Sequence, residues 1–94
     1  MSEVADAVVY NAARHRFELI EQGLTVFADY RREPGRLIIT YVEAPPALRG
    51  SGAAGRLMAA VAAQARAEGV KITPICGYAA AWLRRSAEHR DLIG

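Results

Sequence analysis

The sequence predicts a fold of the α/β (α+β) class, in which helices and strands share one domain. Its sheet should be mixed and mainly antiparallel, with one parallel β-α-β unit. Three observations predict it. Residues 16–31 contain two alternating segments joined by a turn, residues 36–43 form an apolar run before a glycine loop, and residues 53–75 combine a helical pattern with a second apolar run. We expect a single domain over residues 1–94, because an apolar content of 52% suffices for one core.

The first part of the chain predicts antiparallel strands. We expect residues 1–7 to be a frayed leader and residues 8–10 to add a short edge strand. Residues 16–21 alternate between apolar and polar side chains, and residues 24–31 continue the alternation after a turn at Gly23. The two longer segments should therefore pair as a hairpin.

A third strand is predicted over residues 36–43, after the turn signal of Pro34 and Gly35. Its apolar side chains should cover both faces, which is typical of a central strand. We expect one face to carry Leu37, Ile39 and Tyr41 and the other to carry Ile38 and Val42. Pro45 and Pro46 then end the strand, because neither residue can donate a backbone hydrogen bond.

A helix is predicted over residues 53–68, where apolar residues recur along one stripe. The stripe consists of Ala54, Leu57, Met58, Val61, Ala62 and Ala65. Gly69 is the expected C-cap, and residues 70–75 should form a short strand parallel to the one before the helix. A second helical stretch at residues 78–85 and a last turn at residues 88–93 follow.

The loop between the third strand and the helix has the properties of an anion site. Gly50 and Gly52 permit backbone conformations that bring amide groups close to a ligand, and the helix that begins at Ala53 offers free amide donors. The run from Gly50 to Gly55 also matches the G-x-G-x-x-G dinucleotide pattern, which we interpret as accidental because other residues separate it from its strand. A glycine-rich turn without a ligand is the alternative.

Composition argues against several classes of function. The net charge is +2 and no basic run exceeds two arginines, without aromatic residues interleaved, which argues against a nucleic-acid partner. His15 and His89 have no partners at metal-ligand spacing, so we expect no metal site. No apolar segment reaches the roughly 20 residues that cross a bilayer, so no membrane contact is expected. A lone cysteine and the lack of a signal peptide predict a cytoplasmic location.

Three features whose chemical groups can react or bind a ligand are expected at one edge of the sheet. Glu43 ends one parallel strand, Cys76 ends the other, and the glycine loop lies between them in sequence. Glu43 is a candidate general base, with a solvated strand-end carboxylate as the alternative. Cys76 is either a packed apolar residue or, because a helix follows it, a reactive thiolate.

The sequence resembles the GNAT (general N-acetyltransferase) superfamily and, more narrowly, a small single-domain GNAT-like subfamily. The resemblance covers residues 8–92. It is carried by the strand order, by the Glu43 that precedes the prolines, by the Arg49-Gly50-x-Gly52 loop, and by Pro74-Ile75-Cys76-Gly77-Tyr78 after the helix. It implies a GNAT-like sheet whose β-α-β unit carries the acetyl-CoA loop.

The resemblance implies acetyl-CoA as the cofactor. Backbone groups of the loop would hold the pyrophosphate, arginines would face the phosphates, and the strand end would pair with the pantetheine. The residues concerned are Val42, Ala44, Leu48, Arg49, Gly50, Ser51, Gly52, Ala53, Ala54 and Arg56. The resemblance also places Cys76 near the thioester, as an acyl acceptor or a contact to the leaving sulfur. Tyr78 is a candidate donor to that sulfur, with packing at the start of a helix as the alternative. Ala47 departs from the superfamily, whose loop usually has Gln or Arg there.

The function implied is an acetyl-CoA-dependent N-acetyltransferase that transfers acetyl to an amine acceptor. The short chain predicts an open acceptor site, suited to a protein or a polyamine or completed by another subunit. The alternative is a non-catalytic acyl-CoA-binding or protein-interaction module.

Overall fold

The computed structural model describes residues 8–94, so the frayed leader predicted over residues 1–7 lies outside the described residues. One sheet has the strand order β1-β2-β3-β4-β5. Its strands are Val8–Asn11, Arg16–Glu21, Leu24–Glu33, Arg36–Glu43 and Lys71–Pro74. The helices α2 and α3 span Ala53–Glu68 and Gly77–Arg85, and short 3₁₀ turns η1, η2 and η3 span Ala12–Arg14, Pro46–Leu48 and Arg90–Leu92.

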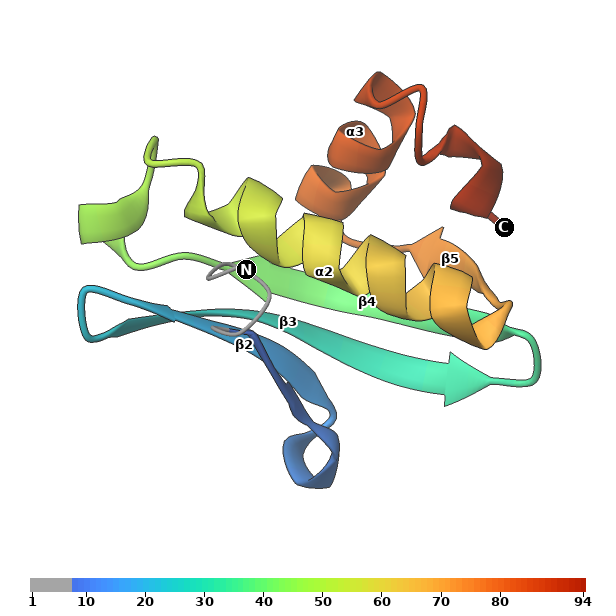
Figure 1. Cartoon of the computed structure of the whole chain (residues 1–94), viewed down its shortest axis with the longest axis horizontal. Coiled ribbons are helices and arrows are strands. Elements are labelled where there is room, and N and C mark those ends of the chain that lie inside the picture. Colours follow the sequence, from blue (N-terminus) through green and yellow to red (C-terminus); the bar gives the residue numbers. More distant parts are fainter. Residues whose placement is uncertain (1–7) are drawn as a thin grey trace.

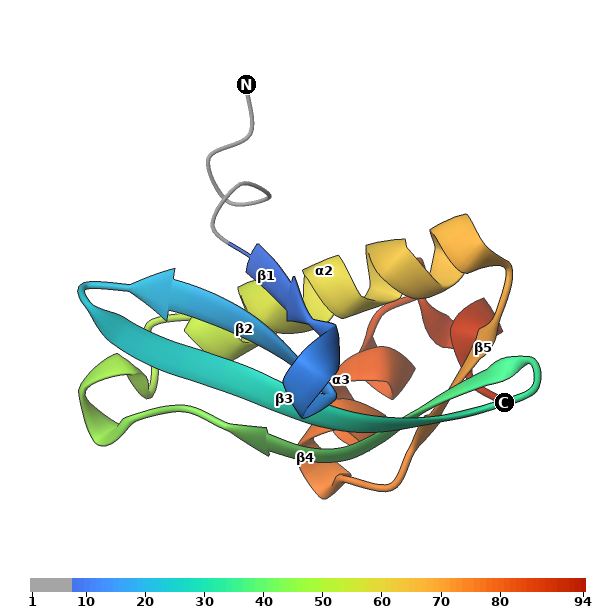
Figure 2. The ribbon, with the colours of Figure 1, turned by 90° about the horizontal axis from the view of Figure 1, so that it is seen from below.

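The sheet is mixed, as the sequence predicts. β1 to β4 pair antiparallel in chain order, and β5 pairs with β4 in parallel. Helix α2 lies across one face of the sheet, and α3 lies on the same side (Figure 1). The view from below shows the strands in front of both helices (Figure 2). None of the described helices has the length and apolar character needed to span a membrane.

The core forms between the sheet and one stripe of α2. The buried residues of the helix are Ala53, Leu57, Met58, Val61, Ala62 and Ala65, so the predicted stripe is confirmed except that Ala54 is only partly buried. They pack against buried side chains of the strands, among them Phe17, Leu19, Val26, Ala28, Leu37 and Ile39. The helix ends at Gly69, which adopts the left-handed C-cap conformation at φ 71°.

β4 contains a β-bulge at Thr40, an extra residue between Ile39 and Tyr41, which pair with adjacent residues of β3. The bulge shifts the alternation of faces, so Tyr41 lies opposite to Ile39 and is 49% exposed, while Val42 packs against the core. The prediction that Tyr41 shares a face with Leu37 and Ile39, and that Val42 lies on the other face, is therefore wrong. Simple alternation assigns faces by counting residues and does not register a bulge.

The parallel strands separate after Ile39. Their pairing ends where Ile39 meets Pro74, and the carbonyl of Ile39 accepts hydrogen bonds from the amides of Ile75 and Cys76 at 3.0 and 3.2 Å. From there the chain turns into α3, whereas β4 continues to Glu43. Among the described residues, this last part of β4 has only β3 as a strand partner. One edge of β4 is thus left open beside the start of α2.

Candidate active site

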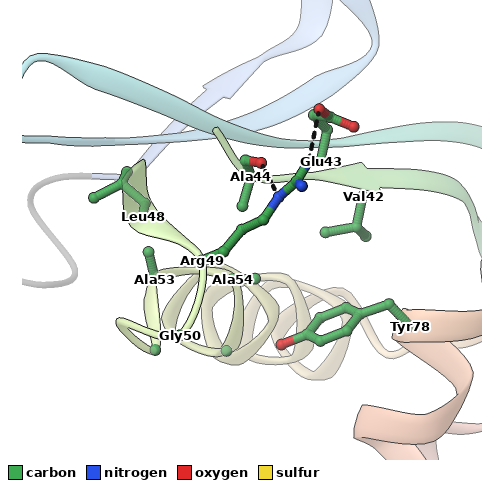
Figure 3. A pocket seen from close by; sticks show the side chains of 11 residues that line it. Val42, Glu43, Ala44, Leu48, Arg49, Gly50, Ala53, Ala54 and Tyr78 are labelled. Atoms are coloured by element: carbon green, nitrogen blue, oxygen red, sulfur yellow. Dashed lines mark hydrogen bonds and ion pairs between the residues drawn. The ribbon is translucent and has the colours of Figure 1, made fainter. Parts of the chain in front are cut away.

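A pocket of about 450 Å³ lies between the end of β4 and the start of α2 (Figure 3). It is lined by Val42, Glu43, Ala44, Leu48, Arg49, Gly50, Gly52, Ala53, Ala54, Gly55 and Tyr78. The end of β4, and the glycine loop with the first turn of α2 that follow it, therefore meet the start of α3, which lies farther along the chain. Every residue predicted for the site lines this pocket except Ser51, Arg56 and Cys76.

Backbone conformation shapes the glycine loop. Gly50 and Gly52 have φ values of 82° and 89°, in the left-handed region that residues with a Cβ adopt only at a cost. A Cβ on Gly52 would also lie 2.9 Å from Nη1 of Arg56. The sequence-based expectation that these two glycines are needed for their backbone freedom agrees with this geometry.

The loop presents free amides at the start of α2. The hydroxyl of Ser51 donates to the carbonyl of Leu48 at 2.5 Å and accepts from the amide of Ala53 at 3.2 Å. Within residues 8–94 the amides of Gly52 and Ala54 have no acceptor, as expected for the first residues of a helix. Together with the positive end of the helix dipole, these amides form a cradle for an anion.

Arg56 connects the loop to the β2–β3 hairpin. Its Nε and Nη2 each donate to a carboxylate oxygen of Glu21 at 2.8 Å, and Nη1 donates to the carbonyl of Ser51 at 3.3 Å. The hydrogen bond from Arg56 lowers the pKa of Glu21, and the same bond raises the pKa of Arg56. Arg56 therefore supports the loop from beside the pocket, with its charge balanced by Glu21.

Glu43 lies at the edge of the pocket and has two side-chain neighbours. The hydroxyl of Tyr41 donates to Oε1 of Glu43. Nη2 of Arg49 lies 3.8 Å from Oε2 (Figure 3). Arg49 also donates from Nε to the carbonyl of Ala44 at 3.1 Å. The bond to the carboxylate raises the pKa of Tyr41. Tyr41 and Glu43 are two residues apart and so share a face of β4. Sequence reasoning missed their contact because it assigned Tyr41 to the core face, from which the bulge at Thr40 turns it away.

Tyr78 reaches the pocket from α3. Its ring extends toward the start of α2 (Figure 3), and its hydroxyl lies 3.9 Å from the position that a Cβ on Gly55 would take. The same Cβ would lie 3.3 Å from Nε1 of Trp82, so the missing side chain at Gly55 allows α3 to pack closely on α2. Gly55 was not among the predicted site residues. Its signal was the third glycine of the G-x-G-x-x-G match, a position where close packing requires glycine.

Cys76 lies at the N-cap of α3, two residues before Tyr78. It is partly buried against the core, and its amide donates to the carbonyl of Ile39. Of the three predicted catalytic residues, Glu43 and Tyr78 line the pocket and Cys76 does not. In the described part of the chain, no group of three His, Cys, Asp or Glu side chains is arranged to hold a metal ion.

The pocket combines groups with different chemical uses. The cradle offers hydrogen-bond donors for an anion, the side chains of Val42 and Leu48 offer apolar walls, and a carboxylate and a phenol lie at its edges. Such a combination suits a ligand that has a charged head and a flexible, partly apolar tail. The carboxylate and the phenol are groups that can transfer protons.

Comparison with known proteins identifies the family. A family model described as GCN5-related N-acetyl-transferase matches residues 16–92. The chain belongs to this family. The match covers β2 to β5, both helices and the whole pocket, and the mixed sheet with two helices is the GNAT-like fold that the sequence predicts. No curated protein matches the chain. Family membership gives the protein an acetyltransferase type of function, in a family whose members generally use acetyl-CoA.

Proposed function

We propose that the protein is an acetyl-CoA-dependent N-acetyltransferase that transfers an acetyl group to an amine acceptor. The observation that carries the proposal is that the amide cradle at the start of α2 opens into the same pocket as Glu43 and Tyr78. A cytoplasmic location and an acceptor such as a protein amine or a polyamine belong to the same proposal.

The residues of the pocket fit acetyl-CoA. The unpaired amides of Gly52 and Ala54 suit a pyrophosphate, and the exposed guanidinium of Arg49 is held to Glu43 by only one contact of 3.8 Å. The open edge of β4 near Val42 offers backbone groups to the amides of a pantetheine chain. When bound, acetyl-CoA supplies an acetyl thioester.

In this proposal Glu43 accepts the proton that the amine loses, and Tyr78 supplies a proton to the departing sulfur. Tyr41 donates to the Glu43 carboxylate and so fixes its orientation. Cys76, two residues before Tyr78, is the candidate for a covalent route in which its sulfur carries the acetyl group.

A non-catalytic acyl-CoA-binding module is the second candidate. Two observations favour it. Arg56 is engaged with Glu21 and Cys76 does not line the pocket, so the site keeps its backbone cradle with fewer free reactive side chains.

Calorimetric titration with acetyl-CoA and CoA tests both candidates, followed by assays with a panel of amines. We expect binding, and transfer that falls in Glu43→Gln and Tyr78→Phe but not in Glu88→Gln, a control with an exposed carboxylate near the end of α3. Binding without transfer to any amine supports the module. An acetyl adduct in the intact mass that disappears in Cys76→Ala supports the covalent route. Absence of binding at millimolar ligand contradicts both candidates.

A further inference from the structure

A second cavity, of about 480 Å³, lies at the other end of α2. Its lining consists of Tyr10, Ala12, His15, Tyr30, Arg31 and Arg32. Arg32 is paired with Glu68, the last residue of the helix whose first turn forms the cradle, and no residue lines both cavities. This cavity is therefore separate from the acetyl-CoA pocket.

One wall of the second cavity is a supported aromatic surface. The ring of Tyr10 stacks on Phe17, with centroids 4.8 Å apart and planes within 4° of parallel. Tyr30 packs against both rings at 5.8 and 5.3 Å. Phe17 is buried, whereas Tyr10 is 39% exposed. Tyr10 thus presents a partly exposed ring that Phe17 supports on one face, with the guanidinium carbon of Arg32 lying 5.5 Å from the ring centroid.

The cavity also carries positive charge. Arg32 is held by Glu68 through two hydrogen bonds of 2.7 and 3.1 Å and donates to the hydroxyl of Tyr10, so its charge is balanced and its position is fixed. Arg31 is exposed and has no ion pair or hydrogen bond through its side chain in the part of the chain described. The rings of His15 and Tyr30 form an edge-to-face pair with their centroids 5.9 Å apart.

The hydroxyl of Tyr30 is a neutral hydrogen-bond donor in the lining. Burial, together with the neighbouring Tyr10, raises the pKa of Tyr30 to about 12, so its hydroxyl keeps its proton at neutral pH. The lining therefore offers an aromatic face, one guanidinium without a counter-charge, an imidazole and a phenol. It contains no carboxylate of its own.

We propose that this cavity binds a mononucleotide. The base would stack on Tyr10, and the phosphate would be bound by Arg31 and His15. Aromatic rings bind bases through their faces, and guanidinium groups bind phosphate through paired hydrogen bonds. The volume lies within the range of small-molecule pockets. The combination is invisible in the linear sequence, because Tyr10 reaches Arg31 only through the pairing of three strands.

Titration of the ¹⁵N-labelled protein with AMP, adenosine and inorganic phosphate tests the proposal by NMR. We expect AMP to shift the amides of residues 10–15 and 30–32, and to bind about tenfold or more tightly than either fragment, because only AMP uses both the ring and the arginine. Shifts confined to residues 49–55 would overturn the proposal, since AMP would then occupy only the cradle. Equal affinity for AMP and either fragment would overturn it as well.

Two variants and a control locate the site. Tyr10→Leu and Arg31→Gln should each weaken AMP binding by about tenfold, by removing the stacking surface or the phosphate contact. Arg84→Gln, which changes an exposed arginine of α3, should leave it unchanged. If Tyr10→Leu fails to fold, Arg31→Gln decides, because its side chain has no partner among the described residues. Unchanged AMP affinity in Arg31→Gln contradicts the proposal.

The same variants separate this proposal from the acetyltransferase function. Acetyl-CoA binding at the cradle should be unchanged in all three, because none of these residues lines the first pocket. A wild-type protein that binds AMP but does not bind acetyl-CoA would contradict only the proposed function. The opposite result would contradict only the nucleotide site.

Discussion

The two pockets for which we propose ligands lie toward opposite ends of α2 and are built in different ways. At the N-terminal end, the cradle consists of backbone amides and of glycines in left-handed conformations. At the C-terminal end, the cavity is made by side chains: a ring stack, and an arginine fixed by Glu68. The first site depends on backbone torsion angles, and the second depends on the identity of individual side chains.

This difference bears on the departure at Ala47. Ala47 lies within η2, and the amides that form the cradle belong to the residues that follow. A site made of backbone tolerates changes of neighbouring side chains as long as the chain path is kept. Substitutions at Leu48, Gly52, Tyr41 and Glu68 test this contrast, in decreasing order of expected effect.

Leu48→Ala should have the largest effect, on folding. Leu48 is the buried residue of η2 and its side chain is 1% exposed, so truncation leaves a cavity under the loop. We expect the free energy of unfolding to fall by about 2–5 kcal/mol. Urea denaturation measures it, with Ile20→Ala at a 46% exposed position as the control. Equal losses of unfolding free energy in the two variants would show that the packing of the Leu48 side chain does not stabilise the loop.

Gly52→Val should break the cradle itself. A residue with a Cβ at φ 89° costs about 1–3 kcal/mol, and here the Cβ also meets Arg56. Gly35→Val is the matched control, because Gly35 has φ 75° but open space around it. Both variants should be less stable, yet only Gly52→Val should weaken acetyl-CoA binding, by about tenfold or more in calorimetry. Similar affinities in both would contradict a backbone cradle.

Tyr41→Phe tests whether the site at the start of α2 also depends on a side chain, that of Tyr41, which acts by orienting Glu43. The variant removes the hydrogen bond to Glu43 but keeps the ring, so stability should change by less than about 0.5 kcal/mol. We expect kcat/KM for acetyl transfer to fall by up to about tenfold. In Glu43→Gln, adding Tyr41→Phe should cause no further loss of that size, since the oriented carboxylate is already gone. Additive losses would argue against the positioning role.

Glu68→Gln should have the smallest effect, and that effect should depend on pH. The hydrogen bond from Arg32 lowers the pKa of Glu68 below its ordinary 4.5, so its stabilising contribution is present above pH 4.5 and is lost as the pH falls through the folded pKa. At pH 7 the variant should lose less than about 1 kcal/mol, because both side chains are partly exposed and screened. Urea denaturation at neutral and acidic pH measures the difference, which should vanish in acid. A difference that persists there would contradict the ion-pair origin.

Much of the fold could be predicted because it follows local rules. Alternation located β2 and β3, and glycines with positive φ marked the turns at Gly23 and Gly35. The strand after the helix was found by its apolar run, although it is shorter than residues 70–75. What failed was the face of Tyr41, because a bulge depends on pairing with a neighbouring strand, and the sequence of β4 alone contains no signal for it.

The sequence predicts which residues line the pocket where the backbone decides their position, and it fails where tertiary packing decides it. The loop glycines follow from the torsion angles that an anion cradle needs. Gly55 was overlooked because its role is to admit Trp82, a residue of another helix. Its place at a strand end put Cys76 on the same sheet edge as Glu43, and the family resemblance put it near the thioester; the chain turns into α3 there, and Cys76 is not part of the pocket lining.

The separation of β4 from β5 has a consequence for hydrogen exchange. Up to Ile39, β4 is paired on both sides, so its amides should exchange slowly along the whole segment. Beyond Ile39, only the amides that point toward β3 are held, and those on the open edge should exchange much faster. Protection along one strand should therefore change from uniform to alternating at a single residue. A ligand that lies along the open edge should restore the uniform pattern.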